Sequence, residues 1–301
     1  MLDTASGLAN WTPEAKPFRE LTESATARPG FPVAMRTLAA NMMQARSSSS
    51  ELRRLFKDAG HYVAAMLAVY LHLTGGLTMP NLKLFCARTG FLSPGRARAV
   101  LLYMQYCGFV EPIASLRQGK SAQWRVRQSV IDAWLVHLRQ ALEAAALVES
   151  EARLILDRFD DPAVAQAFAV IHSEILQVAA KATPGEIATI NAHFMQRRAG
   201  SAVLSTIIAG QDARAFQARE PFNLPIVATA RNFGVTRLHL RRMIRDAREA
   251  GLLVDRPDGA LSFTAQAHKE LCALYSGQIV CLLEAAAKTA IAQSHNPMMN
   301  R

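Results

Sequence analysis

The sequence predicts a mainly α-helical protein in which one chain carries two similar units, each with a short β-hairpin, joined by long helices and related by a pseudo-two-fold axis. Three observations support this prediction. Hydrophobic residues recur at helical spacing in segments that begin at capping residues and end at glycines. The same order of segments occurs twice, and each copy contains two short apolar stretches around a polar turn. The length of 301 residues is enough for about two hydrophobic cores.

The first copy begins with a predicted long apolar helix. Ser48 and Glu51 have the spacing of a capping box, and Gly75-Gly76 marks the end of the helix. Its most apolar run, Tyr62 to Leu73, has 12 residues and contains a histidine. Such a run is too short to span a bilayer, so we interpret it as a buried helix and expect no membrane partner.

Two shorter helices and a hairpin follow in this copy. Thr78 is expected to cap the first of these helices, which ends at Gly90. Ser93, which is followed by a proline, caps the second, which ends at Gly108. Between residues 123 and 128 two apolar residues alternate with two arginines, and this alternation predicts a half-buried strand with a basic outer face.

The second copy has the same order of signals. Asn223 is expected to cap a helix that ends before a turn at Gly234. Thr236 caps the next helix, which ends at Gly251. Two short apolar stretches then surround a tight turn of Arg, Pro, Asp and Gly at residues 256–259, which predicts a second hairpin.

The two copies also align with each other. Residues 87–110 overlay residues 230–253 without a gap, at an offset of 143. Ser93 falls on Thr236, and both copies have a glycine at the end of the helix that follows. We infer a tandem duplication; the alternative is a chance match between helix-rich sequences.

The predicted organisation follows from these boundaries. Helices near residues 130–157, 162–197 and 268–292 are expected to form a shared helical body. The segments are a mobile N-terminal arm at 1–30, a first unit at 31–150, a helical connector at 151–198, a second unit at 199–294 and a frayed tail at 295–301.

The positive charge is concentrated in two places. The formal net charge is +10. Residues 87–128 carry +6 and residues 231–256 carry +4, so the remainder of the chain balances to zero. Charge confined to two windows, one in each copy, is typical of a protein that contacts a polyanion at two points.

The candidate DNA-contacting residues lie opposite the predicted packed faces. A stripe formed by Leu240, Met243, Ile244 and Ala247 is expected to pack inward in the second copy, and Ala97, Val100, Leu101 and Met104 in the first. The second copy then offers Thr236, Arg237, His239, Arg241, Arg242, Arg245 and Arg256. The first offers Ser93, Arg96 and Arg98 on its helix and Arg117, Lys120, Arg125 and Arg127 on its hairpin. A solvated helix face is the alternative interpretation of these arginines, and helix capping that of Ser93 and Thr236.

This pattern resembles the winged helix-turn-helix transcription factors, and the long flanking helices resemble the MarR-like branch. The resemblance covers roughly residues 50–145 and 195–290. The Asp-x-Arg wing tip of that family is matched only in part, by residues 255–258. The resemblance implies a bacterial-type regulator. In that family a homodimer is built from intertwined terminal helices, and each subunit offers one winged helix to DNA.

We therefore predict a cytoplasmic, sequence-specific regulator of transcription that binds double-stranded DNA as a single-chain pseudo-dimer with two unlike recognition helices. A replication initiator with tandem winged helices and a protein-binding tandem winged-helix scaffold are the alternatives. No enzyme is expected, because phosphate-loop, dinucleotide, nucleophile-elbow and zinc-protease motifs do not occur. No metal or cofactor is expected, because the four cysteines form no C-x-x-C pair. A small-molecule effector and a further homodimer are left open.

Overall fold

The computed structural model describes residues 17–113, 122–182, 185–211 and 220–294. This part of the chain is mainly α-helical, as predicted, with two separate two-stranded antiparallel sheets. Arg117 and Lys120 lie outside the described residues, as do the tail at 295–301 and most of the expected N-terminal arm.

The first half of the chain builds a helical layer and then three helices with a hairpin. Two pairs of strand residues, Val110 with Val126 and Pro112 with Trp124, fix the hairpin register. The elements are α2 (Phe18–Ala27), α3 (Phe31–Ser48), α4 (Ser50–Leu55), α5 (Ala59–Leu73), α6 (Met79–Thr89), α7 (Pro94–Tyr106), β1 (Val110–Ile113), β2 (Gln123–Val126) and α8 (Gln128–Ala145).

A connector and a second group of three helices with a hairpin follow. In this hairpin Leu253 lies opposite Phe263. The elements are η1 (Ser150–Ala152), α9 (Arg153–Leu156), α10 (Pro162–Ala182), α11 (Ala188–Ile190), the π-helical turn η2 (Asn191–Met195), α12 (Gly200–Ala209), α13 (Ile226–Phe233), α14 (Arg237–Glu249), β3 (Leu253–Asp255), β4 (Leu261–Phe263) and α15 (Ala265–Ser294).

The order of elements repeats, and so does local detail. The series α5, α6, α7, β1, β2, α8 has the same order as α12, α13, α14, β3, β4, α15. Helices α7 and α14 each have 13 residues and end before a glycine with positive φ, Gly108 at 72° and Gly251 at 70°. The hydrogen bond from Phe109 N to Met104 O has its counterpart, 143 residues later, in the bond from Leu252 N to the Ala247 carbonyl.

The segment before the second helix pairs with the hairpin in both halves. Thr78 forms an isolated antiparallel bridge with Gln123, and Phe222 forms one with Leu261. In each half, the segment before the second helix therefore pairs with one edge of the hairpin. This pairing holds the hairpin against the three helices.

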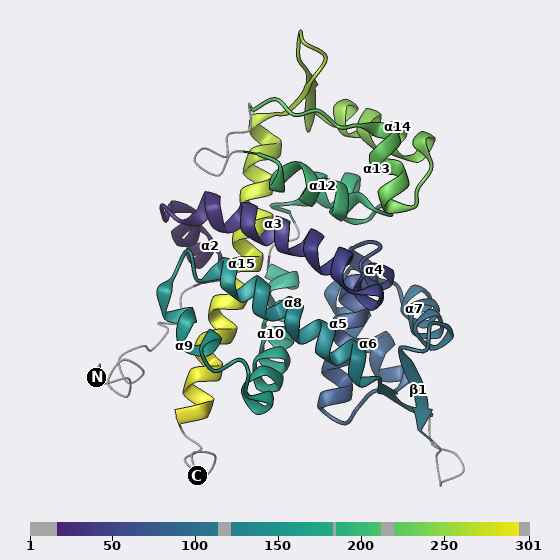
Figure 1. Cartoon of the computed structure of the whole chain (residues 1–301), viewed down its shortest axis with the longest axis vertical. Coiled ribbons are helices and arrows are strands. Elements are labelled where there is room, and N and C mark those ends of the chain that lie inside the picture. The colour runs from purple at the N-terminus through teal and green to yellow at the C-terminus, as the bar shows by residue number, and fades with distance from the viewer. Residues whose placement is uncertain (1–16, 114–121, 183–184, 212–219, 295–301) are drawn as a thin grey trace.

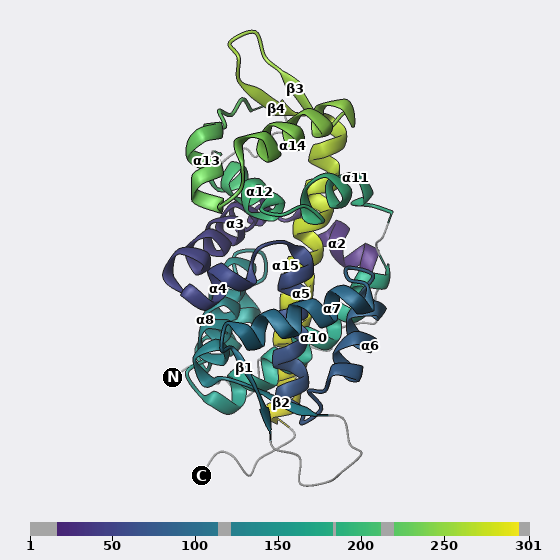
Figure 2. The same cartoon turned by 90° about the vertical axis from the view of Figure 1, so that its right-hand side faces the viewer.

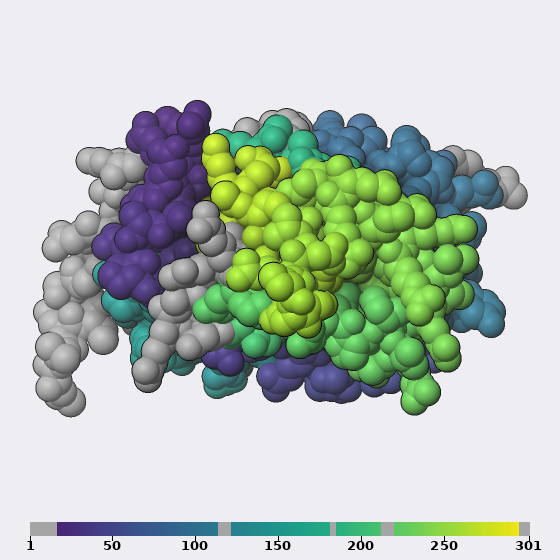
Figure 3. Space-filling model, turned by 90° about the horizontal axis from the view of Figure 1, so that it is seen from above, coloured from purple at the N-terminus to yellow at the C-terminus, as the bar shows by residue number. Residues whose placement is uncertain are grey.

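The arrangement in space follows the longest helix. Helix α15 runs from the second group of helices, at the top of Figure 1, down past α8 and α10. The hairpins lie at opposite ends of the long axis in both side views (Figures 1 and 2). Seen from above, the second group covers much of this end, with the first half visible beside it (Figure 3).

The central helices bury most of the core. Helix α3 packs against both α8 and α12, and α10 packs along α15, so each half contributes to one continuous apolar cluster. Helices α10 and α15 are long and apolar enough to cross a membrane by length and composition alone. Two thirds of the apolar window of α15 is buried within the protein, as in the core helix of a globular domain.

Five sequence-based expectations are corrected by the structure. Residues 18–27 of the expected arm form α2, which packs on α15, where the Phe18 ring lies 3.9 Å from the position of a Cβ on Gly277. The long helix expected from 130 to 157 ends at Ala145. The turn that follows Ala145 packs tightly against the start of α3: a Cβ added to Gly30 would lie only 1.9 Å from the Leu147 carbonyl oxygen.

The other three corrections concern the ends of helices. Ser49 rather than Ser48 accepts the hydrogen bond from the Leu52 amide, and the apolar helix is divided at residues 56–58 before α5 begins. In the second half, α13 begins after Pro225 with no side-chain cap, so Asn223 is not the capping residue. The helix expected over 162–197 ends at 182 and is followed by the short turns α11 and η2.

Candidate nucleic-acid interface

Helix α14 is held by one face and one end. The Thr236 hydroxyl accepts a hydrogen bond from the His239 amide at 3.1 Å, which confirms the predicted cap. The predicted inward stripe is buried: Leu240, Met243, Ile244 and Ala247. Burial of this stripe at helical spacing leaves the opposite face of α14 in solvent.

Three arginines on that face are available to an anion. Arg237, Arg241 and Arg242 are exposed, and none of their guanidinium groups has a hydrogen bond or ion pair with another residue in the described ranges. The Arg256 side chain, in the turn of the β3–β4 hairpin, is likewise exposed and has no partner among the described residues. An unpaired guanidinium keeps its donors for a carboxylate, a phosphate or a guanine edge.

Two other candidates on α14 are engaged within the protein. The Arg245 Nη2 atom lies 3.0 Å from Asp246 Oδ1, and its Nε atom lies 3.6 Å from Glu249 Oε1. The His239 Nε2 atom donates to the Arg198 carbonyl at 3.0 Å. Of the five side chains predicted on this helix, three therefore keep their hydrogen-bond donors unpaired among the described residues, and two are engaged within the protein.

The corresponding helix of the first half, α7, presents less free charge. Ser93 accepts a hydrogen bond from the Arg96 amide at 3.3 Å, so it is the predicted cap. Arg98 is exposed and has no partner among the described residues. Arg96 instead lies with Nη2 2.9 Å from the Asp58 carboxylate. Because this ion pair ties Arg96 to the start of α5, we assign it a structural role.

Asp58 anchors that ion pair in a buried position. Its side chain is only 6 % exposed and accepts a hydrogen bond from the His61 amide at 2.9 Å, so it caps α5. Burial acts to raise the Asp58 pKa, but the hydrogen bonds from His61 and the charges of His61 and Arg96 outweigh it, and the pKa is lowered. The carboxylate is therefore ionised at neutral pH.

The hairpin of the first half is also partly neutralised. Trp124 and Val126 are buried and alternate with exposed arginines, as predicted. However, Arg125 forms an ion pair with Glu111 on the neighbouring strand, and Arg127 Nε lies 3.8 Å from the same carboxylate. The antiparallel register of β1 and β2 places Glu111 opposite Arg125, and this pairing was not apparent from the sequence because the two residues are far apart in it.

A further basic group lies between the two halves. Lys57, before α5, accepts a hydrogen bond at its carbonyl from the Ala199 amide at 2.7 Å, and its Nζ lies 3.8 Å from the Tyr103 ring centroid on α7. Burial first, and then the charge of Arg198, lower the Lys57 pKa, with a smaller contribution of the same sign from Arg54. Arg54 and Arg198 are exposed.

Sequence reasoning missed this junction because it counted charge only within the two basic windows. A signal was present: Arg54 and Lys57 stand within five residues before Ala59-Gly60 in the first copy, and Arg198 stands directly before Ala199-Gly200 in the second. The structure brings these two places together. Helices α7 and α14 both lie on the right-hand side of Figure 1, which Figure 2 turns toward the viewer.

Comparisons with known proteins leave the family open. No protein-family model matches the sequence, and no match was found among curated proteins or among solved structures. The functional argument therefore rests on the geometry and charge of the residues described above.

Proposed function

We propose that this protein is a sequence-specific, double-stranded DNA-binding regulator of transcription. The observation that carries the proposal is the face of α14 on which Arg237, Arg241 and Arg242 stand exposed and unpaired among the described residues. A helix of this length fits the major groove, where arginine hydrogen-bonds guanine and phosphate. The remaining candidates at this end are Thr236 at the helix start and Arg256 in the hairpin turn.

The proposal treats each half as a winged helix-turn-helix unit. In this assignment α6–α7 and α13–α14 are the helix pairs, and the hairpins β1–β2 and β3–β4 are the wings. The supporting observations are the repeated order of elements, the isolated bridge from the segment before each second helix to its hairpin, and the cap and glycine at the ends of α7 and α14.

The proposal also treats the chain as a pseudo-dimer. Helices α7 and α14 face the same side, with the hairpins at the two ends (Figure 2). One chain of this shape would cover two half-sites, and Arg54, Lys57 and Arg198 would lie toward the DNA backbone between them. Since α7 and α14 expose different side chains, the two half-sites would differ in sequence.

Selection of bound fragments from a random pool of DNA duplexes tests the proposal. We expect enrichment of one defined motif, and an affinity that falls steeply with salt because phosphate contacts release counterions. The variant Arg237→Ala/Arg241→Ala/Arg242→Ala should lose enrichment. Its matched control, Arg19→Ala/Arg153→Ala/Arg158→Ala, removes the same charge from exposed sites elsewhere and should keep it.

The other outcomes of this selection separate the alternatives. Enrichment of several repeats of one short site in each fragment would favour a replication initiator. Absence of enrichment together with a shallow salt dependence would favour a protein-binding scaffold and would contradict the proposal.

A further inference from the structure

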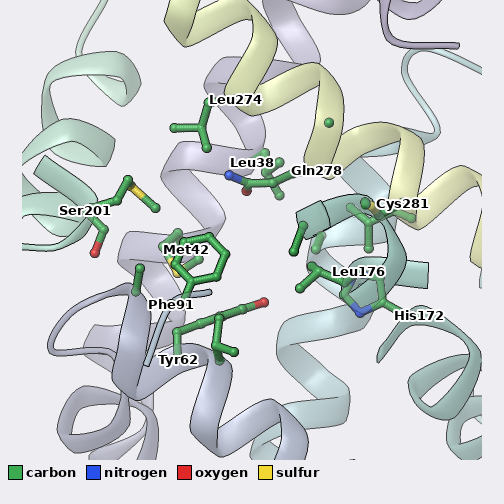
Figure 4. Close-up of a pocket in the computed structure, with 18 of the residues that line it drawn as sticks. Leu38, Met42, Tyr62, Phe91, His172, Leu176, Ser201, Leu274, Gln278 and Cys281 are labelled. Atoms are coloured by element: carbon green, nitrogen blue, oxygen red, sulfur yellow. The ribbon is translucent and has the colours of Figure 1, made fainter. Parts of the chain in front are cut away.

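A cavity lies where the two halves meet in the helical body. Its volume is about 170 Å³. Leu38 and Met42 of α3, Tyr62 of α5, Leu176 of α10 and Leu274 of α15 contribute to its wall (Figure 4). Because elements from both halves line it, the cavity lies in the packing that joins them.

The wall is mainly aliphatic and aromatic, with a few polar atoms. Figure 4 shows the Tyr62 hydroxyl and the His172 ring directed toward one another, with the Gln278 amide and the Ser201 hydroxyl at other points of the wall. Asp58 also contributes, but its carboxylate is already held by His61 and Arg96. The cavity therefore offers no unpaired charge among the described residues.

Two histidines at the wall have unmet hydrogen-bonding capacity. His172 is 3 % exposed and stacks on Phe168, and its Nδ1 has no partner among the described residues. His137 is 2 % exposed; its Nε2 lies 3.2 Å from the Tyr62 hydroxyl, while Nδ1 has no partner in the same ranges. Most buried polar atoms in folded proteins are paired, so unmet nitrogens beside a cavity point to a hydrogen-bonding occupant.

Burial also sets the protonation of these rings. It lowers the pKa of His172 to about 4, and burial together with the charge of His172 lowers that of His137 to about 3. Both rings are neutral at neutral pH, and a neutral imidazole has one nitrogen that donates and one that accepts. A ligand hydroxyl both donates and accepts, so it can hydrogen-bond either to the donating or to the accepting nitrogen of such a ring.

We propose that this cavity binds an uncharged small molecule that contains an aromatic or aliphatic ring and one hydroxyl group, with the hydroxyl hydrogen-bonded to His172. The size is suitable, because an apolar cavity of about 150 Å³ accommodates a benzene-sized ring. Charge is selected against, because an ion would lose its hydration without gaining an unpaired counter-ion. This site does not depend on DNA binding, so either proposal can fail without the other.

Calorimetric titration with three matched probes tests the site. The probes are 4-ethylphenol, ethylbenzene and 4-ethylbenzoate, which share one ring and differ in the polar group. We expect 4-ethylphenol to bind once per chain, ethylbenzene about threefold to tenfold more weakly for want of one hydrogen bond, and 4-ethylbenzoate not at all. Quenching of the fluorescence of Trp134, whose ring centroid lies 5.1 Å from that of Tyr62, provides a second readout.

Variants locate the binding. His172→Phe keeps a ring and removes both nitrogens, so 4-ethylphenol should bind no better than ethylbenzene. Leu274→Trp fills the cavity and should abolish binding of both; Ser201→Leu is a second filling variant if the first does not fold. Val178→Ala, at a site on the same helix as His172 that is 71 % exposed, is the control and should leave every affinity unchanged.

Two results would overturn the proposal. One is the absence of binding of both uncharged probes to the folded chain. The other is binding that neither His172→Phe nor a folded filling variant alters, because the probe would then lie elsewhere.

Discussion

The two halves of the molecule share a frame and use their arginines differently. Helices α7 and α14 have the same length, the same type of hydroxyl cap and the same glycine ending. On α14 the side chains of three arginines are unpaired among the described residues. In the first half, by contrast, Arg96 pairs with Asp58, and Glu111 pairs with both Arg125 in β2 and Arg127 just after it. The comparison teaches that a count of basic residues does not measure the charge available to a partner.

The shared frame and the differing surface have separate physical origins. Inward positions are set by packing: Ala97, Val100, Leu101 and Met104 are buried in α7 as their counterparts are in α14. Outward positions are under no packing constraint, so one helix can expose arginine where the other exposes Leu102. We therefore expect matched substitutions at helix ends or buried positions to have similar effects in the two halves, and matched substitutions of charged residues to have different effects.

The largest expected difference concerns Asp58 and Asp246, which are both acidic partners of arginines. Asp58→Ala removes a buried helix cap and leaves Arg96, which is 37 % exposed, and His61 without their partner, and we expect a loss of about 2–3 kcal/mol in the free energy of unfolding. Urea-induced unfolding followed by circular dichroism measures it.

Asp246→Ala is the matched change in the second half. The Asp246 side chain is 23 % exposed, against 6 % for Asp58, and it caps no helix, so the loss of its ion pairs with Arg197 and Arg245 should leave the stability close to that of the unmodified chain. Equal losses in the two variants would show that the Asp58 pair has no special structural role and would remove the contrast between the halves.

The next effect is an acid sensitivity of the first half and the connector. Unfolded histidine titrates near 6.5, whereas the folded pKa values of His137 and His172 are about 3 and about 4 because both rings are buried. Below pH 6.5 the unfolded chain binds protons that the folded chain does not, so stability falls by up to about 1.4 kcal/mol per pH unit for each histidine. These two are the fully buried histidines of the described residues, and neither belongs to the second half, where burial also lowers the pKa of the half-buried His268.

Unfolding in urea at pH 7, 6 and 5 measures this slope. His172→Phe should reduce the loss between pH 6 and pH 5 by less than half, because His137 still titrates and burial also lowers the pKa of His72 and His268. A slope that is the same in the variant and in the unmodified chain would mean that these rings are not held neutral by burial.

A third contrast concerns affinity for DNA. If α14 enters the major groove, Arg241→Ala or Arg242→Ala should each weaken binding to the selected motif by about 1–3 kcal/mol and relax base preference at one position. Arg98→Ala, on α7, should weaken binding less and leave base preference unchanged. Fluorescence anisotropy with the motif and single-base variants checks both. A larger loss from Arg98→Ala would reverse the proposed roles of the two helices.

The smallest expected difference is between Gly108 and Gly251, whose alanine variants should lose equal stability. Gly108 and Gly251 have φ of 72° and 70°, and a Cβ at either position would meet no atom closer than 3.9 Å. Their alanine variants should therefore lose a similar amount of stability, about 1–2 kcal/mol, from backbone strain alone. Thermal unfolding measures it, and DNA affinity below the melting temperature should be retained. A variant of normal stability that does not bind DNA would contradict this assignment.

Local signals predicted much of the fold. Thr78, Ser93 and Thr236 cap the helices expected of them, because a hydroxyl before an apolar helical pattern satisfies the first free amides. The inward stripes and both hairpins were also predicted, since alternation and turn residues act over a few positions. The winged-helix assignment and the DNA contacts stay predictions.

Long-range effects could not be predicted in the same way. The pairing of Arg96 with Asp58 spans 38 residues of sequence and depends on how α7 packs against the start of α5. The basic junction of Lys57 and Arg198 exists only because the two halves dock. Helix α2 has only 10 residues, too few for a clear periodic signal in the sequence, and it is stabilised by its contact with α15.

Footprinting of a single bound chain on the selected DNA tests the central claim most directly. The account predicts one chain on an asymmetric site with two unlike halves. The half under α14 should be defined in sequence, and the half under α7 should tolerate sequence changes but be sensitive to salt. A perfect palindrome protected equally in both halves by two chains would contradict the account. In that case only the second half of each chain would contact DNA, and the first half would serve as a structural unit.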